Sequence, residues 1–284
     1  MKKLILLALF SAAYLAEAVA QDIIYDKADS IKIVRILKNA NKRPASKNRC
    51  VYFGEQFLGV PYVASTLEVG DKERLVVNTQ GLDCTTFVET VVALTMCDKQ
   101  NKRTFKDYCN NLKKIRYWNG EKKGYASRLH YFAFWIKDNE DKGIVSEVLT
   151  PSTPYTRQQT LCVNYMTQNP DKYKHLKNNP KNISAVKYYE DQFEGMKVRY
   201  IPKEYFNLPR KKLSFVKDGD IIGLVTKKKG LDTTHLGIAV WKNGKLHLLN
   251  ASYLRKKVVL EKQTLYRYSQ GQKSQIGMRL ARVK

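Results

Sequence analysis

Apolar side chains recur at helical spacing near the start of the chain. Within residues 30–40, Ile33, Ile36 and Leu37 lie on one face of a helix with a period of 3.6 residues, and Ser30 stands where an N-cap is expected. This segment therefore predicts an amphipathic helix.

The clearest helical pattern covers residues 83–97. Asp83 is the expected N-cap, and Cys84 lies on the same stripe as Phe87 and Val88. That stripe should face the core, so the pattern predicts a buried helix that begins at a cysteine.

Two further segments differ from these in composition. Residues 125–150 form an aromatic-rich stretch that is predicted to be helical. Residues 151–200 are rich in Asn, Lys and Tyr and poor in apolar periodicity, so we interpret them as an insertion wrapped on the main domain.

The hydrophobic period changes from helical to extended after about residue 200. Strands are predicted at residues 220–226, 236–241 and 245–250, and Asn243-Gly244 between the last two is a strong hairpin signal. Helices followed by an antiparallel sheet predict an α+β fold in one domain.

The first twenty residues have the pattern of a secretory signal peptide. A basic start is followed by an apolar run and by small residues that end at Ala20. We therefore expect a signal peptide, residues 1–20, and a single periplasmic or secreted domain, residues 21–284. Glu17 interrupts the apolar run before the ~20 residues that span a bilayer, and no later stretch is long enough, so no membrane span is expected.

The charge is high for a chain of globular composition. The 284 residues include 51 Lys and Arg against 26 Asp and Glu, a formal charge of +25, while 43% hydrophobic residues suffice for a packed core. Cleavage after Ala20 would remove Lys2, Lys3 and Glu17 and leave +24. For an exported chain, nucleic acid is not an expected partner, and the charge predicts attraction to anionic envelope polymers.

The cysteines and histidines show no metal-site spacing. The five cysteines are Cys50, Cys84, Cys97, Cys109 and Cys162, without a C-x-x-C pair. Bridges between Cys97 and Cys109 and between Cys50 and Cys162 stay open, as does the absence of any disulfide. The four histidines are scattered, so no metal or other cofactor is expected, and His175 in the insertion is expected on the solvated surface.

Cys84 is the candidate nucleophile. The free N–H groups and the dipole at a helix start favour an anion, which lowers the pKa of a thiol and makes its thiolate available. This arrangement is typical of cysteine hydrolases. The alternative is an inert core cysteine on an apolar helical face.

His235 is the candidate base, because it opens a predicted strand. If Asn243-Gly244 forms a two-residue turn, Asn250 becomes the diagonal neighbour of His235. Side chains alternate along a strand, so His247 then projects from the opposite face. We therefore favour Asn250 as the residue that orients His235, although a register slip of one residue would exchange Asn250 and His247.

Several short motifs occur in a fixed order and carry a resemblance. They are Phe57-Leu-Gly-Val-Pro-Tyr62, Gly81-Leu-Asp-Cys84-Thr-Thr-Phe-Val-Glu, Asp218-Gly-Asp-Ile-Ile, His235-Leu-Gly-Ile and Leu249-Asn-Ala-Ser252. This set resembles the NlpC-type papain-like cell-wall hydrolases. Ser127-Arg-Leu-His-Tyr131, Tyr200-Ile-Pro-Lys and Leu231-Asp-Thr-Thr-His235 resemble more closely the branch called N-acetylmuramoyl-L-alanine amidase-like. The resemblance runs from about residue 33 to the C-terminus. It implies a papain-like (NlpC-type) core with N-terminal helices and a central antiparallel sheet.

The resemblance also implies residue roles. In that family the cysteine at the helix start is the nucleophile and the histidine opening the strand is the base, which correspond to Cys84 and His235. The third position is commonly a histidine; here it is Asn250, and an asparagine orients the imidazole in papain-like enzymes. Tyr62 is implied to bind substrate or oxyanion, with a core aromatic as the alternative. Substrate contacts are also implied for four residues that could instead cap the helix or pack in the core: Asp83, Arg128, His130 and Tyr131.

The predicted reaction is hydrolysis of an amide bond in peptidoglycan stem peptides through a thioester, without a cofactor. The family name points to the bond between N-acetylmuramic acid and L-Ala. The same chemistry would serve an endopeptidase that cuts a γ-D-glutamyl-diamino acid bond. From a different class, a non-catalytic basic protein that binds anionic envelope polymers, with a structural Cys84, is the alternative.

Overall fold

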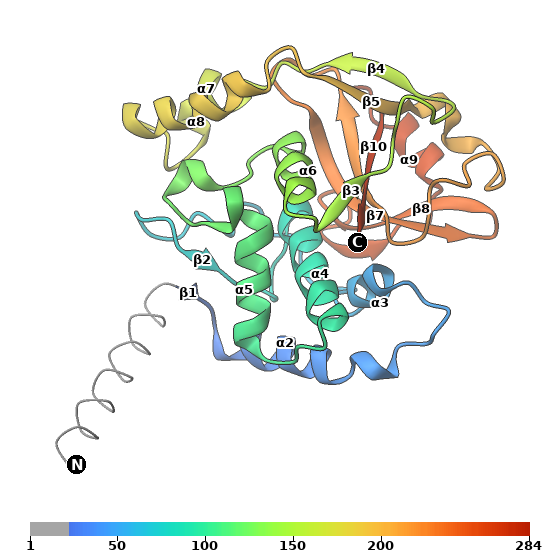
Figure 1. The fold of residues 1–284 in the computed structure, drawn as a ribbon, viewed down its shortest axis with the longest axis horizontal. Coiled ribbons are helices and arrows are strands. Elements are labelled where there is room, and N and C mark those ends of the chain that lie inside the picture. The colour runs from blue at the N-terminus through green and yellow to red at the C-terminus, as the bar shows by residue number, and fades with distance from the viewer. Residues whose placement is uncertain (1–22) are drawn as a thin grey trace.

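Helices from the N-terminal half pack against an antiparallel sheet from the C-terminal half (Figure 1). The computed structural model describes residues 23–284. The predicted signal peptide, residues 1–20, lies outside the described residues. The arrangement of helices and antiparallel strands confirms the α+β prediction.

The first helix, α2 (Lys27–Lys38), is the one expected over residues 30–40, but it begins earlier. Asp26 is the N-cap, and its backbone N–H donates to Asp29 Oδ2 at 3.0 Å. Ser30 as the N-cap was therefore wrong. An acidic pair three residues apart closes the first turn before Ser30 is reached.

The central helix, α4 (Cys84–Lys99), begins as predicted. Asp83 Oδ1 accepts the backbone N–H of Thr86 at 2.8 Å, which confirms Asp83 as the N-cap. The helix is buried on every side from Thr86 to Cys97, because α3 (Arg49–Glu55), α5 (Phe105–Arg116) and the sheet surround it. The expectation of one buried stripe was therefore too narrow, because all faces of this part of α4 are buried.

Residues 125–150 do not form the single helix that was expected. They divide into a short turn η3 (Tyr125–Ser127), the helix α6 (Phe132–Asp141) and the strand β3 (Val145–Glu147). The backbone is extended at Arg128, and α6 begins only after Tyr131, where Asp232 Oδ2 accepts the N–H of Ala133 at 2.6 Å. A cap supplied from a distant loop sets this boundary.

The large sheet has the strand order β4-β5-β10-β6-β7-β8-β9, with β3 also paired to β10, and each of these pairs is antiparallel. Its strands are β4 (Arg157–Thr160), β5 (Lys197–Pro202), β6 (Ile221–Thr226), β7 (Thr233–Lys242), β8 (Lys245–Ser252), β9 (Lys257–Leu260) and β10 (Gln275–Val283). The three predicted strands are confirmed as β6, β7 and β8. A separate parallel pair joins β1 (Ile23–Ile24) to β2 (Leu75–Val76).

The hairpin between β7 and β8 has the predicted register. Lys242 pairs with Lys245 and Val240 with His247, and both turn residues, Asn243 and Gly244, have positive φ. Two positive φ angles are what a two-residue turn of this kind requires, which explains the Asn-Gly sequence.

The sheet is covered on both faces. Alternate residues such as Ile221 and Ile238 pack against the helices, whereas Ile222 and Ala239 pack on the opposite face. That second face is covered by η5 (Lys203–Asn207) and α9 (Leu265–Gln270). The catalytic candidates on β7 and β8 therefore belong to strands held from both sides.

The segment over residues 151–200 adds two strands to the sheet and contributes helices that lie outside it. Its strands β4 and β5 pair with each other and continue the sheet beyond β10. Between them lie α7 (Tyr165–Gln168), η4 (Pro170–Lys172) and α8 (Pro180–Gln192); α7 and α8 stand at one side of the molecule, away from α2 and α3 (Figure 1).

Within residues 23–284, no helix is long and apolar enough to cross a membrane. All five cysteines have free thiols, so neither the Cys97–Cys109 bridge nor the Cys50–Cys162 bridge is present.

Candidate active site

Cys84 stands at the meeting point of three segments. It opens α4, directly after a stretch in which Leu82 pairs with Tyr62 in an isolated bridge. Tyr62 is held from the other side, where its backbone N–H donates to the carbonyl of Lys256 at 2.9 Å. Cys84 and His235 line one small cavity of about 140 Å³. The fold thus brings residues 62, 84 and 235 to the same place.

The thiol of Cys84 is not activated in the way its helix position predicts. Burial and the neighbouring Asp83 carboxylate raise the pKa of Cys84 to about 11, although a hydrogen bond from the backbone of Leu236 opposes the rise. The expectation of a lowered pKa was therefore wrong. Loss of hydration and a like charge outweigh the donors at the helix start, so the sulfur carries its proton at neutral pH.

His235 is oriented by Asn250. The ring Nε2 lies 2.8 Å from Asn250 Oδ1, and Asn250 is fully buried. The Asn250 amide nitrogen points to the carbonyls of Leu248 and Val259 at 3.4 and 3.5 Å, which leaves Oδ1 to face the ring. An amide oxygen accepts, so His235 Nε2 carries the hydrogen and Nδ1 is the free acceptor. Burial lowers the pKa of His235, and the bond to Asn250 opposes this shift only in part.

His247 lies elsewhere. It projects from the opposite face of β8, where its Nδ1 lies 3.0 Å from the carbonyl of Glu261. The structure therefore brings Asn250, and not His247, to the ring of His235.

Two tyrosines lie near the sulfur. Tyr62 is half-buried with its ring edge-on to Tyr253, and burial together with Cys84 and Asp83 raises its pKa well above the ordinary value. Tyr268 on α9 stacks on the His235 ring with 6.3 Å between centroids, and burial raises its pKa to about 12. Both phenols therefore stay protonated and can donate. Sequence reasoning missed Tyr268, since nothing local marks a tyrosine on a short helix remote from the motifs.

A larger cavity of about 440 Å³ adjoins the small one. The two share lining residues, including Thr85, His130 and Tyr131. Its far side is formed by Lys172, Tyr173 and Lys174 from the segment over residues 151–200. We call the two cavities together the groove, of which the small one is the catalytic cavity. The insertion thus supplies one wall of the groove.

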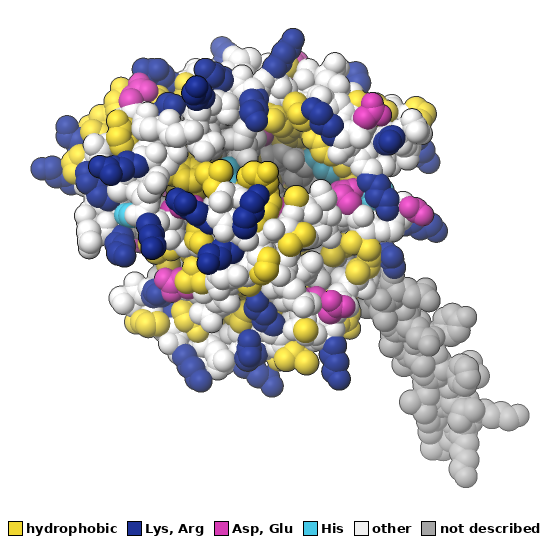
Figure 2. Space-filling view, turned by 180° about the vertical axis from the view of Figure 1, so that it is seen from behind, with side chains coloured by type: hydrophobic (Ala, Val, Ile, Leu, Met, Phe, Trp, Pro, Cys, Tyr) yellow, Lys and Arg dark blue, Asp and Glu magenta, His cyan; other side chains and the backbone are white. Residues whose placement is uncertain are grey.

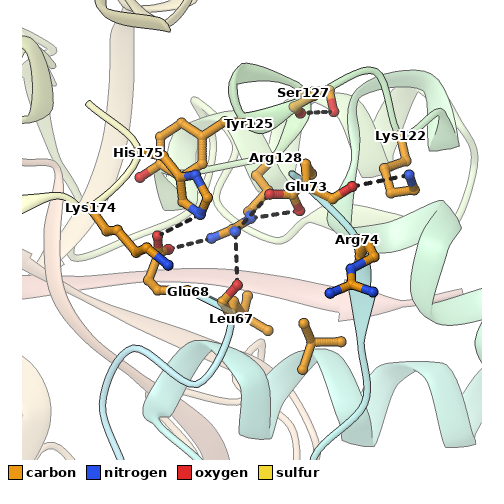
Figure 3. A network of polar contacts seen from close by, with 12 residues as sticks. Leu67, Glu68, Glu73, Arg74, Lys122, Tyr125, Ser127, Arg128, Lys174 and His175 are labelled. Carbon is orange, nitrogen blue, oxygen red and sulfur yellow. Dashed lines mark hydrogen bonds and ion pairs between the residues drawn. The ribbon is translucent and has the colours of Figure 1, made fainter. Parts of the chain in front are cut away.

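Arg128 also lines the larger cavity, and its guanidinium is already paired (Figure 3). Its Nε and Nη2 donate to the two Glu73 oxygens at 2.8 and 2.7 Å, and its Nη1 donates to Glu68 at 2.7 Å. A further bond runs from Nη2 to the carbonyl of Leu67. Arg128 therefore lines the groove while it ties down the loop over residues 67–73.

His175 belongs to the same cluster. It is only 7% exposed, its ring packs at a tilt against that of Tyr125 with 4.9 Å between centroids, and it lies 3.4 Å from Glu68 (Figure 3). The expectation of a solvated His175 was wrong, because the lysine- and asparagine-rich composition of its segment hides the fact that this residue faces inward. Glu68, Glu73 and His175 were not singled out from the sequence, and no local pattern distinguishes them.

The remaining expected substrate residues also hold structural bonds. His130 Nε2 lies 2.9 Å from the carbonyl of Tyr125, and burial and Arg128 lower its pKa to about 3. The Tyr131 hydroxyl donates to Glu190 at 2.6 Å and accepts from the backbone N–H of Met166 at 3.0 Å.

Asp83 also lines the groove. Its Oδ1 takes the cap bonds from Thr86, and its Oδ2 has no hydrogen-bond partner among residues 23–284. This oxygen remains available to a ligand.

No group of three or more His, Cys, Asp or Glu side chains suited to a metal ion occurs in the described part of the chain. The chemistry available to the groove is that of a thiol, a neutral imidazole oriented by an amide, and two protonated phenols.

Comparison with known proteins gives one family and several structural neighbours. A family model described as "AmiA-like: N-acetylmuramoyl-L-alanine amidase-like" matches residues 52–278. A search of curated proteins finds no match.

Among solved structures, an N-acetylmuramoyl-L-alanine amidase from Bacteroides uniformis is 39% identical, with a TM-score of 0.78 over 83% of this chain and 97% of its own. A Bacteroides fragilis protein named as a xylanase is 40% identical, with a TM-score of 0.76 over 81% of this chain and 99% of its own. A Legionella pneumophila protein shares the fold at 20% identity, with a TM-score of 0.68 over 90% and 95% of the two chains.

Proposed function

Because this chain belongs to the AmiA-like, N-acetylmuramoyl-L-alanine amidase-like family, we propose that it hydrolyses an amide bond of peptidoglycan with Cys84 as nucleophile, His235 as base and Asn250 as the residue that orients the base. The hydrogen bond between Asn250 and His235, which lines one cavity together with Cys84, carries the proposal. We further propose that the helices and the sheet form a papain-like core of the NlpC type.

The first step begins from an uncharged pair. Cys84 is a thiol and His235 is neutral at pH 7, since burial raises the pKa of the first and lowers that of the second. His235 Nδ1 takes the proton as the sulfur attacks the carbonyl carbon of the substrate. The amide of Asn250 then stabilises the imidazolium that forms.

The oxyanion is held by protonated donors. The backbone N–H of Cys84 and the hydroxyl of Tyr62 are the proposed donors, and the raised pKa of Tyr62 keeps its hydrogen in place. His235 gives its proton to the leaving amine, which departs as the carbon–nitrogen bond breaks. Water then attacks the thioester with His235 again as the base, releasing the carboxylate and the Cys84 thiol.

We propose the bond between N-acetylmuramic acid and L-Ala as the target, following the name of the family. The γ-D-glutamyl-diamino acid bond is the alternative for the same groups. Asp83 Oδ2 is available to a substrate amine, while Arg128, His130 and Tyr131 shape the groove through their internal bonds.

Glycoside hydrolysis, suggested by the name of one structural neighbour, requires two available carboxyl groups. Within the groove, Glu68 is paired with Arg128 and Glu89 is paired with Arg116 at 2.7 Å. Asp232 accepts the backbone N–H groups of Ala133 and Thr233 through its two oxygens. Among the described groove carboxyls, Asp83 is the one that has neither an ion pair nor both oxygens hydrogen-bonded. The groove therefore favours amide hydrolysis.

We propose an extracytoplasmic location, which agrees with the family and with the predicted signal peptide. The positive charge supports attraction to anionic envelope polymers, and Figure 2 shows Lys and Arg side chains spread over one face with few Asp and Glu among them.

Mass spectrometry of digested peptidoglycan tests the proposal. Free stem peptides that begin with L-Ala are expected. L-Ala-D-Glu left on the sugar would identify the endopeptidase instead. If the folded protein releases no fragment from peptidoglycan, the non-catalytic binder is favoured.

A further inference from the structure

A further cavity lies at the opposite end of α4 from Cys84. It has a volume of about 570 Å³ and is formed by residues 43–50, the end of α4 at Thr95 and Lys99, residues 210–220 and the end of β10 at Arg282. A helix rises 1.5 Å per residue, so Thr95 and Lys99 lie roughly 17 to 22 Å along α4 from Cys84. We call it the basic cavity; it is separate from the groove.

Cations dominate its lining. Seven Lys or Arg residues contribute, against two carboxylates: Arg43, Lys47, Arg49, Lys99, Arg210, Lys217 and Arg282, with Asp218 and Asp220. Both carboxylates are already used. Arg282 donates to the two Asp220 oxygens at 2.7 and 2.8 Å, and Arg210 lies 3.2 Å from Asp218.

Two of the other cations are paired outside the cavity. Arg49 binds Asp98 at 2.8 Å, and Lys47 forms an ion pair with Glu55. Arg43, Lys99 and Lys217 remain, and none of these three has a carboxylate within 4.0 Å among the described residues. The basic cavity therefore carries three uncompensated positive charges.

Arg43 is held in place by the backbone. Its Nη1 donates to the carbonyls of Pro44 and Lys47, while its Nε is buried without a hydrogen-bond partner in residues 23–284. A buried donor that no protein group satisfies is uncommon, and a bound water or ion is one way in which such a group is satisfied. Ser46 and Ser214 add hydroxyl groups to the same cavity.

We propose that the basic cavity binds a multivalent oxyanion, such as a phosphate or diphosphate group. A guanidinium and two ammonium groups match the charge of such a group, and Arg is suited to bidentate contact with it. The volume lies in the range of small-molecule sites. The same chemistry is offered by a free organic phosphate and by the headgroup of an anionic lipid. The site does not depend on Cys84 or on the proposed amidase reaction.

Calorimetric titration of the mature chain with pyrophosphate tests the site. We compare wild type with a triple variant, Arg43→Gln, Lys99→Gln and Lys217→Gln. The matched control is Lys227→Gln, Lys228→Gln and Lys229→Gln, which removes the same charge from an exposed run outside the basic cavity.

The cavity variant should bind at least about tenfold more weakly than wild type, and the control should change much less, because close charge-assisted bonds exceed long-range attraction. Thermal melts of each variant establish that it is folded. Equal weakening in both variants, or no saturable binding by wild type, would overturn the proposal.

A second arm identifies the source of the oxyanion. Wild type is sedimented with vesicles of phosphatidylcholine and phosphatidylglycerol. Cosedimentation lost only in the cavity variant assigns a lipid headgroup, whereas pyrophosphate binding without cosedimentation assigns a free phosphate. Hydrolysis of a soluble, uncharged amide substrate by the cavity variant should equal that of wild type, so failure of this site and failure of the proposed amidase are distinguishable.

Discussion

The catalytic cavity and the ion-paired cluster of Arg128, Glu73 and Glu68 hold buried titratable groups in opposite charge states. In the cavity, burial keeps Cys84 protonated and His235 neutral. In the Arg128 cluster, the guanidinium keeps its charge and is paired with Glu73 and Glu68. The first arrangement leaves a proton available for transfer. The second holds the loop of the groove in place but requires three charges to be desolvated.

This contrast indicates which property each region should lose on mutation. A change in the cavity should affect reaction rates with little effect on folding, whereas a change in the Arg128 cluster should affect stability. Four experiments test this division and a fifth tests the surface charge, and the greatest loss is expected in the first.

Replacing Cys84 with Ala should reduce release of stem peptides to background, because no other thiol lines the catalytic cavity. The rate is measured by mass spectrometry of soluble products, and the melting temperature should change little. Cys162→Ala, at an exposed cysteine, is the control. Hydrolysis by Cys84→Ala at the wild-type rate would refute the nucleophile.

Alkylation of Cys84 by iodoacetamide should be slow at pH 7 and rise about tenfold per pH unit until the pKa near 11, because the thiolate reacts. The measurement uses a Cys162→Ala background, in which Cys84 is the most exposed cysteine. A rate that is already maximal at pH 7 would mean an activated thiolate, and the cavity would then hold a charged pair.

Replacing Arg128 with Ala should lower the free energy of unfolding by about 3–5 kcal/mol, because Glu73 would be left buried and unpaired. Urea unfolding measures the loss. Lys137→Ala, which breaks an exposed ion pair with Asp141, should leave the urea midpoint nearly unchanged. Equal urea midpoints for Arg128→Ala and wild type would mean that the Arg128 ion pairs contribute no more to stability than an exposed pair does.

Replacing Asn250 with Ala should lower kcat about 10- to 100-fold, since a hydrogen bond to a charged ring contributes roughly 1.5–3 kcal/mol. His247→Ala, on the other face of β8, is the comparison and should retain far more activity. The opposite ranking of the two variants would assign the orienting role to His247.

Hydrolysis of insoluble peptidoglycan should weaken a few-fold as salt rises, because the net positive charge favours encounter with an anionic polymer. A soluble, uncharged amide substrate should show little salt dependence. Equal salt effects on the two substrates would contradict a role of surface charge in encounter.

Local signals in the sequence were sufficient where the chain needs only its near neighbours. The Asn243-Gly244 turn sets the pairing of Val240 with His247, and this register follows from backbone geometry over a few residues. Asp83 as the cap of α4 is equally local. For this reason the sequence was enough to predict His235 and Asn250 as neighbours.

The helix boundaries were harder, because distant groups decide them. The start of α6 depends on Asp232, which lies about a hundred residues later in the chain. The start of α2 was missed for a different, local reason: Asp26 takes the role of N-cap in place of Ser30, because its backbone N–H bonds to Asp29 three residues later.

The amino-acid sequence was sufficient to establish the α+β order of elements, the helix that begins at Cys84 and the hairpin that joins His235 to Asn250. The protonation of Cys84, the pairing of Arg128 and the burial of His175 depend instead on the folded arrangement. The Asn243-Gly244 turn and the caps at Asp26 and Asp83 are set by bonds between residues a few positions apart. The pKa of a buried group, and the partner with which a charged side chain pairs, depend on the remote side chains that surround that group and exclude water from it. Those neighbours come together only when the chain has folded.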